Sequence, residues 1–227
     1  MNGRTNLIWV KPFMFKPSKI LTLALALVAM SAWAQTPIPP LAKIKIAADA
    51  GDPVAQDKMA EWDGANREMW YRKSAGQGYA HAQGQLGELL FLRSQLTLRV
   101  KPEIHAALGE ETIKWATLAA TQGDKQGQAT LARIYLEGKL TKQDLIEAYK
   151  WGDLSARNSS TEFIVFTGNS SRDAAILGMK ADQIHEAQKR VAAFVPHPFS
   201  KSDLPDPAGF SKSSSLALAA PPTIALP

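Results

Sequence analysis

Apolar residues recur at three- and four-residue intervals through the middle of the chain, which is the spacing that lines one face of an α-helix. A long alternation of apolar and β-branched residues, the mark of half-buried strands, does not occur beyond the short run at residues 163–166. Two clear helical stripes are Ile113, Trp115, Leu118 and Ala119, and Leu145, Ala148, Tyr149, Trp151 and Leu154. The pattern predicts an all-α fold.

Three segments of the chain share one pattern, in which a glycine is followed five residues later by glutamine and three residues after that by a large apolar residue. These sets are Gly51, Gln56 and Met59; Gly78, Gln83 and Leu86; and Gly123, Gln128 and Leu131. In a second register, Trp70 lies eight residues before Gly78 and Trp115 lies eight before Gly123, while Trp151 lies in an equivalent setting before residues 158–159. Self-similarity at fixed offsets is typical of repeat proteins.

The glycines suit the position just after a helix, where the backbone takes a positive φ that glycine adopts without steric cost. Asp52 and Pro53 suit the start of the next helix, as a capping side chain and a first-turn proline. Residues 141–144 resemble a capping box. The expected helix pairs are 52–62 with 65–76, 79–93 with 108–121, and 124–137 with 142–157, flanked by a starter helix at 41–49 and a closing helix at 181–194. Residues 94–103 are expected to be a loop insertion, and residues 158–171 match the repeat poorly.

The first 34 residues read as a secretory signal peptide. Four basic and no acidic residues precede an apolar run at residues 20–30, and Ala32-Trp33-Ala34 fits a signal peptidase site. An uncleaved membrane anchor is the alternative, but the run is shorter than the roughly 20 residues that span a bilayer. The sequence therefore predicts export to the periplasm or the medium.

The other end, residues 195–227, is expected to be a flexible tail. Seven of the chain's 14 prolines lie between Pro196 and Pro227, together with the run Ser213-Ser214-Ser215. Such a segment can neither run as a helix nor join a sheet interior. The repeat domain is therefore expected to cover residues 41–194.

The composition excludes several functions. The chain has 26 basic and 21 acidic residues, a net charge of +5. Without the four basic residues of the signal, 22 basic and 21 acidic residues remain, a net charge of +1, which offers no broad field for nucleic acid. The chain has no cysteine, so disulfides, thiol catalysis and thiolate metal sites are all excluded.

Residues 70–83, with the sequence WYRKSAGQGYAHAQ, continue to Leu86-Gly87 and resemble the Sel1-like repeat family. Residues 147–151 resemble the same second-helix element, and residues 179–188 are similar to the closing helix of such arrays. The resemblance covers residues 41–194. It implies a short right-handed α/α solenoid of Sel1/TPR-like helix pairs that binds a partner on its concave side, without catalysis and without a cofactor.

Candidate chemistry in the chain is sparse. His81, His105, His185 and His197 are far apart, and none of them pairs with another at the i, i+4 spacing of a helical metal site. The β-lactamase motifs Ser-x-x-Lys and Lys-Thr-Gly are absent. The adjacent carboxylates Glu110 and Glu111 are expected in the first turn of a helix, where negative charge is favourable. Trp70, Trp115 and Trp151 are expected in the core, with Trp62 the least certain.

Partner-binding residues are expected on the first helix of each pair, at positions off the packing stripe. These are Asp57, Glu61, His81, Glu88, Gln126 and Arg133. They could equally be solvated polar positions. Two other functions stay open: an enzyme or carrier for cell-wall or small-molecule ligands, and an immunity or inhibitor protein for a single partner. A deep polar pocket would favour the enzyme or carrier over a scaffold that binds a partner in an open groove. No nucleic acid and no stable membrane insertion after signal cleavage are expected.

Overall fold

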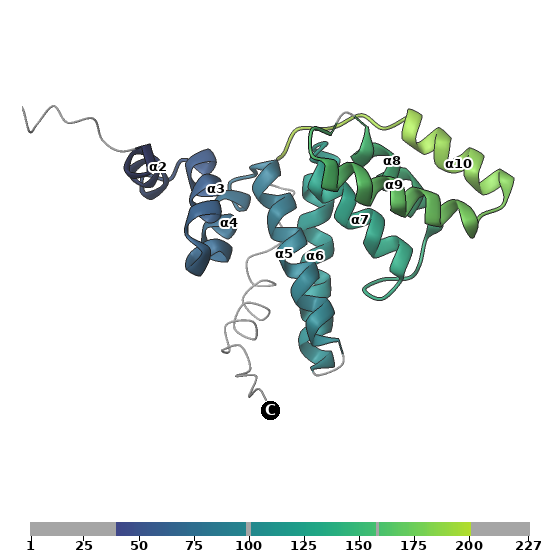
Figure 1. Ribbon diagram of the computed structural model, residues 1–227, viewed down its shortest axis with the longest axis horizontal. Coiled ribbons are helices and arrows are strands. Elements are labelled where there is room, and N and C mark those ends of the chain that lie inside the picture. The colour runs from purple at the N-terminus through teal and green to yellow at the C-terminus, as the bar shows by residue number, and fades with distance from the viewer. Residues whose placement is uncertain (1–39, 99–100, 158, 201–227) are drawn as a thin grey trace, which may run out of the picture. The chain divides into compact units, whose positions relative to one another are not determined.

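The computed structural model describes residues 40–98, 101–157 and 159–200, and all regular elements in these ranges are helices (Figure 1). The predicted all-α fold is confirmed. The predicted signal peptide, and the predicted tail from residue 201 onward, lie outside the described residues. The helices are α2 (Pro40–Asp49), α3 (Pro53–Trp62), η1 (Gly64–Asn66), α4 (Arg67–Ala75), α5 (Ala80–Thr97), α6 (Pro102–Thr121), α7 (Lys125–Glu137), α8 (Leu145–Ala156), α9 (Glu162–Leu177) and α10 (Ala181–Ala192).

The helices from α3 onward pack in the order of an α/α repeat. The pairs α3 with α4, α5 with α6 and α7 with α8 are each in contact, and each second helix also contacts the first helix that follows it. First helices contact one another as well, α5 against α7 and α7 against α9. We call α3, α5, α7 and α9 the first-helix row. Contacts limited to neighbouring units are what define a solenoid.

Each repeat boundary is the same tight turn at a glycine. Gly51, Gly78 and Gly123 have φ values of 100°, 93° and 93°, as their positions after the helices predict. At the first of them, the Gly51 amide donates to Ala48 O at 3.1 Å and the Asp52 amide donates to Ala47 O at 3.0 Å. This pair of hydrogen bonds is the Schellman motif, and the same pair of bonds recurs after α4 and α6.

The repeated glutamine closes the same turn from the next helix. Gln56 Nε2 donates to Ala48 O at 3.1 Å, Gln83 Nε2 to Ala75 O at 3.1 Å, and Gln128 Nε2 to Ala120 O at 3.3 Å. Two of these glutamines also accept a bond from the glutamine just before the following glycine: Gln77 donates to Gln56 at 2.8 Å and Gln122 to Gln83 at 2.6 Å. The fixed offset between glycine and glutamine therefore reflects a side chain that satisfies a helix-end carbonyl.

The core contains the tryptophans that the second register predicts. Trp70, Trp115 and Trp151 are buried, with at most 5% of their surface exposed. Trp62, at the end of α3, is 68% exposed and is not a core residue. Trp151 packs edge-on against Phe194, with ring centroids 5.6 Å apart, so the residue after α10 joins the core of the third pair.

The predicted loop at residues 94–103 is wrong, because the extra residues lengthen both helices of the second pair. The helix α5 has 18 residues and α6 has 20, against 10 and 9 for α3 and α4. The extension is held by buried polar contacts, in which Ser94 Oγ donates to Phe91 O at 2.7 Å and His105 Nδ1 lies 2.9 Å from Ser94 O. The apolar pattern alone carried no sign of these contacts.

Two further local predictions are corrected. Residues 141–144 form no capping box: Asp144 caps α8, and its Oδ1 accepts from the amides of Ile146 and Glu147 at 3.0 Å each. Residues 162–177 form a fourth first helix, α9, although the repeat pattern fails there. This helix approaches α8 through small residues, since a Cβ on Gly168 would lie 2.6 Å from Gly152 O. No large apolar residue is needed at such a contact, so the usual helical stripe is missing.

We expect the buried glutamine to be essential to the fold. Changing Gln83 to alanine removes the bond that its Nε2 donates to Ala75 O and the bond that its Oε1 accepts from Gln122, and it opens a cavity in a fully buried site. The free energy of unfolding should fall by about 2 to 4 kcal/mol. Urea denaturation measures this loss.

The matched control is Gln188→Ala, because Gln188 is exposed on α10. Its unfolding free energy should stay within about 0.5 kcal/mol of wild type. Equal losses in the two variants would contradict a special role for the glutamine at the turn.

Candidate functional site

The first-helix row brings two of the predicted binding residues together at the ends nearest the glycine turns. His81, in the first turn of α5, places Nδ1 3.0 Å from both carboxylate oxygens of Asp57 on α3. Asp57 is buried, whereas 42% of the His81 side chain is exposed. A buried carboxylate therefore fixes the orientation of an imidazole at the protein surface.

The surroundings of His81 favour its charged form. The hydrogen bond that His81 donates to the Asp57 carboxylate is the largest cause that raises the pKa of His81 above its usual value, and the charges of Asp124 and Glu61 act in the same direction. On its other side, His81 Nε2 lies 3.3 Å from Gln85 Nε2, so the neutral imidazole can accept from this amide. A protonated ring needs the amide oxygen turned towards it instead.

A second carboxylate, which is half-buried, lies at the start of α7. Asp124 caps this helix by accepting from the Gly127 amide at 2.7 Å. Its Oδ1 lies 2.0 Å from the place that a Cβ on Gly84 would occupy, so the carboxylate rests directly against α5. Burial raises the pKa of Asp124 to about 6, and it does so despite the opposing effects of the Gly127 hydrogen bond and the charge of His81.

Glu61 and Tyr79 complete the group of residues around His81. We call Asp57, Glu61, Tyr79, His81 and Asp124 the His81 cluster. Glu61 is exposed on α3. Burial and the charge of Asp57 raise the pKa of Tyr79, whose ring centroid is 6.2 Å from that of His81. Asp57 is the carboxylate that is hydrogen-bonded to the imidazole, while Asp124 and Glu61 act on it through their charges. Three carboxylates against one imidazole give the cluster an acidic character at neutral pH.

The other predicted binding residues serve contacts between α5 and α7. Arg133 Nη1 donates to Glu88 Oε1 at 2.8 Å, and Thr130 Oγ1 donates to Glu88 Oε2 at 2.9 Å. The Arg133 guanidinium also lies 4.3 Å from the centroid of the Phe91 ring. Gln126 is buried. Glu88 and Arg133 thus join α5 to α7, while Gln126 bonds Thr130 within its own helix. The part of these three residues in binding a partner stays a prediction.

A polar network that the sequence did not predict joins α4, α5 and α6. Glu111 is 2% exposed and forms an ion pair with Arg72 of α4, and it also accepts from Trp115 Nε1 at 3.2 Å. Glu68 extends the network, since it lies 2.8 Å from Arg72 and 2.7 Å from Arg93. The predicted first-turn position of Glu111 is wrong because α6 begins at Pro102 and not near residue 108.

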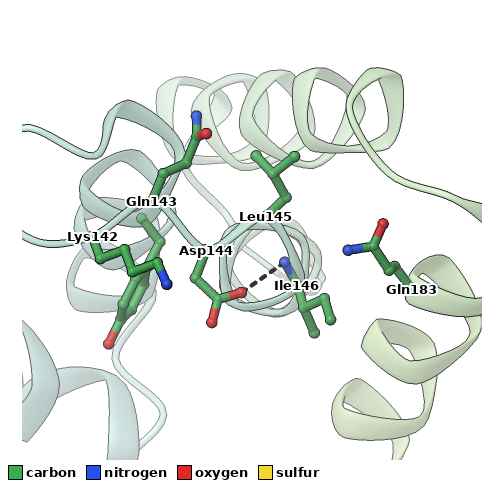
Figure 2. Close-up of a pocket in the computed structure, with 7 residues that line it drawn as sticks. Lys142, Gln143, Asp144, Leu145, Ile146 and Gln183 are labelled. Carbon is green, nitrogen blue, oxygen red and sulfur yellow. Dashed lines mark hydrogen bonds between the residues drawn. The ribbon is translucent and has the colours of Figure 1, made fainter.

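A surface pocket of about 350 Å³ lies between α7, α8 and α10 (Figure 2). Its polar groups already serve as helix caps. Asp144 caps α8, and Gln183 Oε1 accepts from the Lys180 amide at the start of α10, at 2.9 Å. In the described part of the chain, no group of three or more acidic, histidine or cysteine side chains could hold a metal ion. Among the described helices, none is both long and apolar enough to cross a membrane.

The raised pKa of Asp124 gives a pH-dependent stability with a defined sign. A carboxyl with a raised pKa binds more protons in the folded than in the unfolded state, so its ionisation destabilises the protein between about pH 4 and pH 6 and at all higher pH values. Asp124→Asn removes this charge and keeps a good capping residue. It should raise the unfolding free energy by about 1 to 3 kcal/mol at pH 8 and change it little at pH 4.

Urea denaturation at pH 4, 6 and 8 measures this difference. The control is Asp52→Asn, because Asp52 caps α3 in the same way, by accepting from the Ala55 amide at 2.6 Å, but is exposed. The control should show no gain that grows with pH. A stability difference for Asp124→Asn that is the same at pH 4 and pH 8 would argue against the buried charge.

Comparisons with known proteins give little beyond the fold. No protein-family model matches the chain, and no curated protein matches it. Among solved structures, the chain is similar to a protective antigen present in uropathogenic Escherichia coli strains, described as displaying an SLR fold, at 20% identity and a TM-score of 0.41. The match covers 93% of this chain and 51% of that protein, so the chain spans about half its length. SLR denotes the Sel1-like repeat, the family that residues 70–83 resemble.

Proposed function

We propose that this chain is an exported, non-catalytic helical repeat scaffold that binds a protein or peptide segment on its first-helix row. The observation that carries the proposal is the geometry of His81, which is held by buried Asp57 yet presents a large part of its ring to solvent. A polar side chain that is both oriented and accessible loses little conformational entropy when it contacts a partner.

The charge of the His81 cluster indicates the chemistry of the partner. Asp57, Glu61 and Asp124 outnumber the single imidazole, and Glu61 is exposed beside it. Lysine or arginine side chains, or backbone amides at the end of a segment, complement such a surface. A basic segment is therefore the partner that fits best.

Catalysis has little support around His81. A histidine that acts as a general base needs a nucleophile or a water-holding group within hydrogen-bond reach. Among the described residues, the imidazole is hydrogen-bonded to the Asp57 carboxylate and the Gln85 amide, and neither is a nucleophile that an imidazole activates. Binding is the simpler role for this side chain.

Export is supported by the amino-acid sequence of the first 34 residues. Their basic start, apolar run and Ala-x-Ala site are the features of a secretory signal. The proposed place of action is the periplasm or the medium, and the proposed role is that of an adaptor.

A capture experiment tests the binding site. The double variant Glu61→Gln, His81→Gln removes two ionisable groups and keeps an amide that can donate to Asp57. Purified wild type, used as bait against proteins of the exported fraction, should retain a partner that the variant retains at least tenfold less, because the oriented charges are gone. Quantitative mass spectrometry of the captured proteins measures the ratio.

The matched control is Glu110→Gln, because Glu110 is exposed on the second helix α6. It should retain the partner as wild type does, and circular dichroism should show all three proteins folded. Equal capture by wild type and the double variant would exclude the His81 cluster as the binding surface.

A further inference from the structure

The segment that follows α10 runs back onto the repeat (Figure 1). We call residues 195–200 the strap. The His197 amide donates to Thr121 O, at the end of α6, at 3.1 Å. Two prolines, Pro196 and Pro198, limit the strap to extended backbone, because proline fixes its own φ and disfavours helix at the residue before it.

The strap places an apolar side chain on each of two glycine turns. Pro196 Cγ lies 3.3 Å from the position of a Cβ on Gly123. The Phe199 ring lies still closer to the turn before α5: its Cδ1 is 2.1 Å from the position of a Cβ on Gly78. The ring therefore rests on the backbone of Gly78, in space that any other residue type would fill.

The spacing of these contacts matches the repeat. Three residues of extended chain span about 10 Å, which is close to the 8 to 10 Å that separates packed helices. Pro196 and Phe199 are three residues apart and rest on turns of successive repeats. An extended segment can thus place one apolar side chain on the glycine turn of each successive repeat.

A third turn of the same kind carries no such contact within the described residues. Gly51 has the same positive φ and the same two helix-end hydrogen bonds as Gly78 and Gly123. Among the described residues beyond its chain neighbours, none has an atom within 4 Å of the position of a Cβ on Gly51. We call Gly51, Gly78 and Gly123 the turn row. It consists of three equivalent flat sites, two of which the strap occupies.

We propose that the turn row is a docking surface for an extended protein segment with proline or aromatic residues at three-residue spacing, and that the strap is its resident, displaceable occupant. The strap is lightly held, since Val195, Pro196, His197 and Pro198 all stay exposed. A partner segment of the same chemistry can therefore exchange with it. The capture experiment changes Glu61 and His81, whereas the strap experiments change Pro196 and Phe199, so either proposal can fail alone.

Amide exchange in the purified protein tests the resident occupant. The amide of His197 should exchange at least tenfold more slowly in wild type than in the double variant Pro196→Ser, Phe199→Ser, because the two apolar anchors are lost. The control Val195→Ser changes an exposed strap residue and should exchange as wild type does. Equal exchange in wild type and the double variant would overturn the strap contact. Protection that grows with protein concentration would also overturn it, because the occupant would then belong to a second copy.

A peptide in trans tests the docking surface itself. The blocked hexapeptide Val-Pro-His-Pro-Phe-Ser, added at millimolar concentration to the double variant, should shift the amide NMR signals of Gly78 and Gly123. The same peptide with serine in place of Phe and the first Pro should shift them at least fivefold less, and wild type should need more peptide because its strap competes. If both peptides act alike, or neither shifts these signals, the turn row recognises no such side chains and the proposal fails.

Discussion

The repeat depends on one hydrogen bond, from a buried glutamine amide back to the carbonyl at the end of the preceding helix. The helix-end carbonyl already accepts one bond from the amide of the turn glycine, and the glutamine gives it a second donor, since a carbonyl oxygen has two lone pairs. Gln83 donates to Ala75 O from within the next helix and also accepts from Gln122, which follows α6 in the same pair. One side chain therefore joins three successive helix ends, and it fixes both the angle of the turn and the register between repeats. An apolar residue of similar size would fill the space but remove both of these bonds, so that Ala75 O would keep only the bond from the Gly78 amide and Gln122 Nε2 only its bond to Leu118 O.

The parts of the fold that could be predicted are those with local causes. A glycine after a helix, an aspartate–proline start and a tryptophan at a fixed distance each act within one turn of chain, so they were visible as offsets in the sequence. The helix α9 was missed because it packs through the small residues Gly168, Ser171 and Ala175. Its large residues Phe163 and Phe166 are 60% and 70% exposed. Small residues of this helix therefore face the core and large apolar residues face solvent, which is the opposite of the usual helical pattern. The extension of α5 and α6 was missed because it depends on buried polar bonds at Ser94 and His105.

The candidate site shows the same division. Helical spacing placed Asp57 and His81 on the first-helix row, but their contact joins residues 24 apart in the chain. That pairing depends on how α3 and α5 are placed against each other, which the sequence of neither helix specifies. Glu88 and Arg133 are 45 residues apart and were expected to be free polar positions, yet they pair with each other. Helical periodicity predicts which face of its helix a side chain occupies, but not which residue of another helix it contacts.

The turn row and the His81 cluster use the same short stretches of backbone. Gly78 supports Phe199 and is followed within three residues by Tyr79 and His81, while Gly123 supports Pro196 and is followed at once by Asp124. The positive φ of each glycine sets the direction in which the next helix starts, and hence the place of these ionisable side chains. A side chain larger than hydrogen at either turn would displace the strap and reorient the helix start together. This shared dependence explains why glycine, and not merely a flexible residue, is required at the two turns that the strap covers.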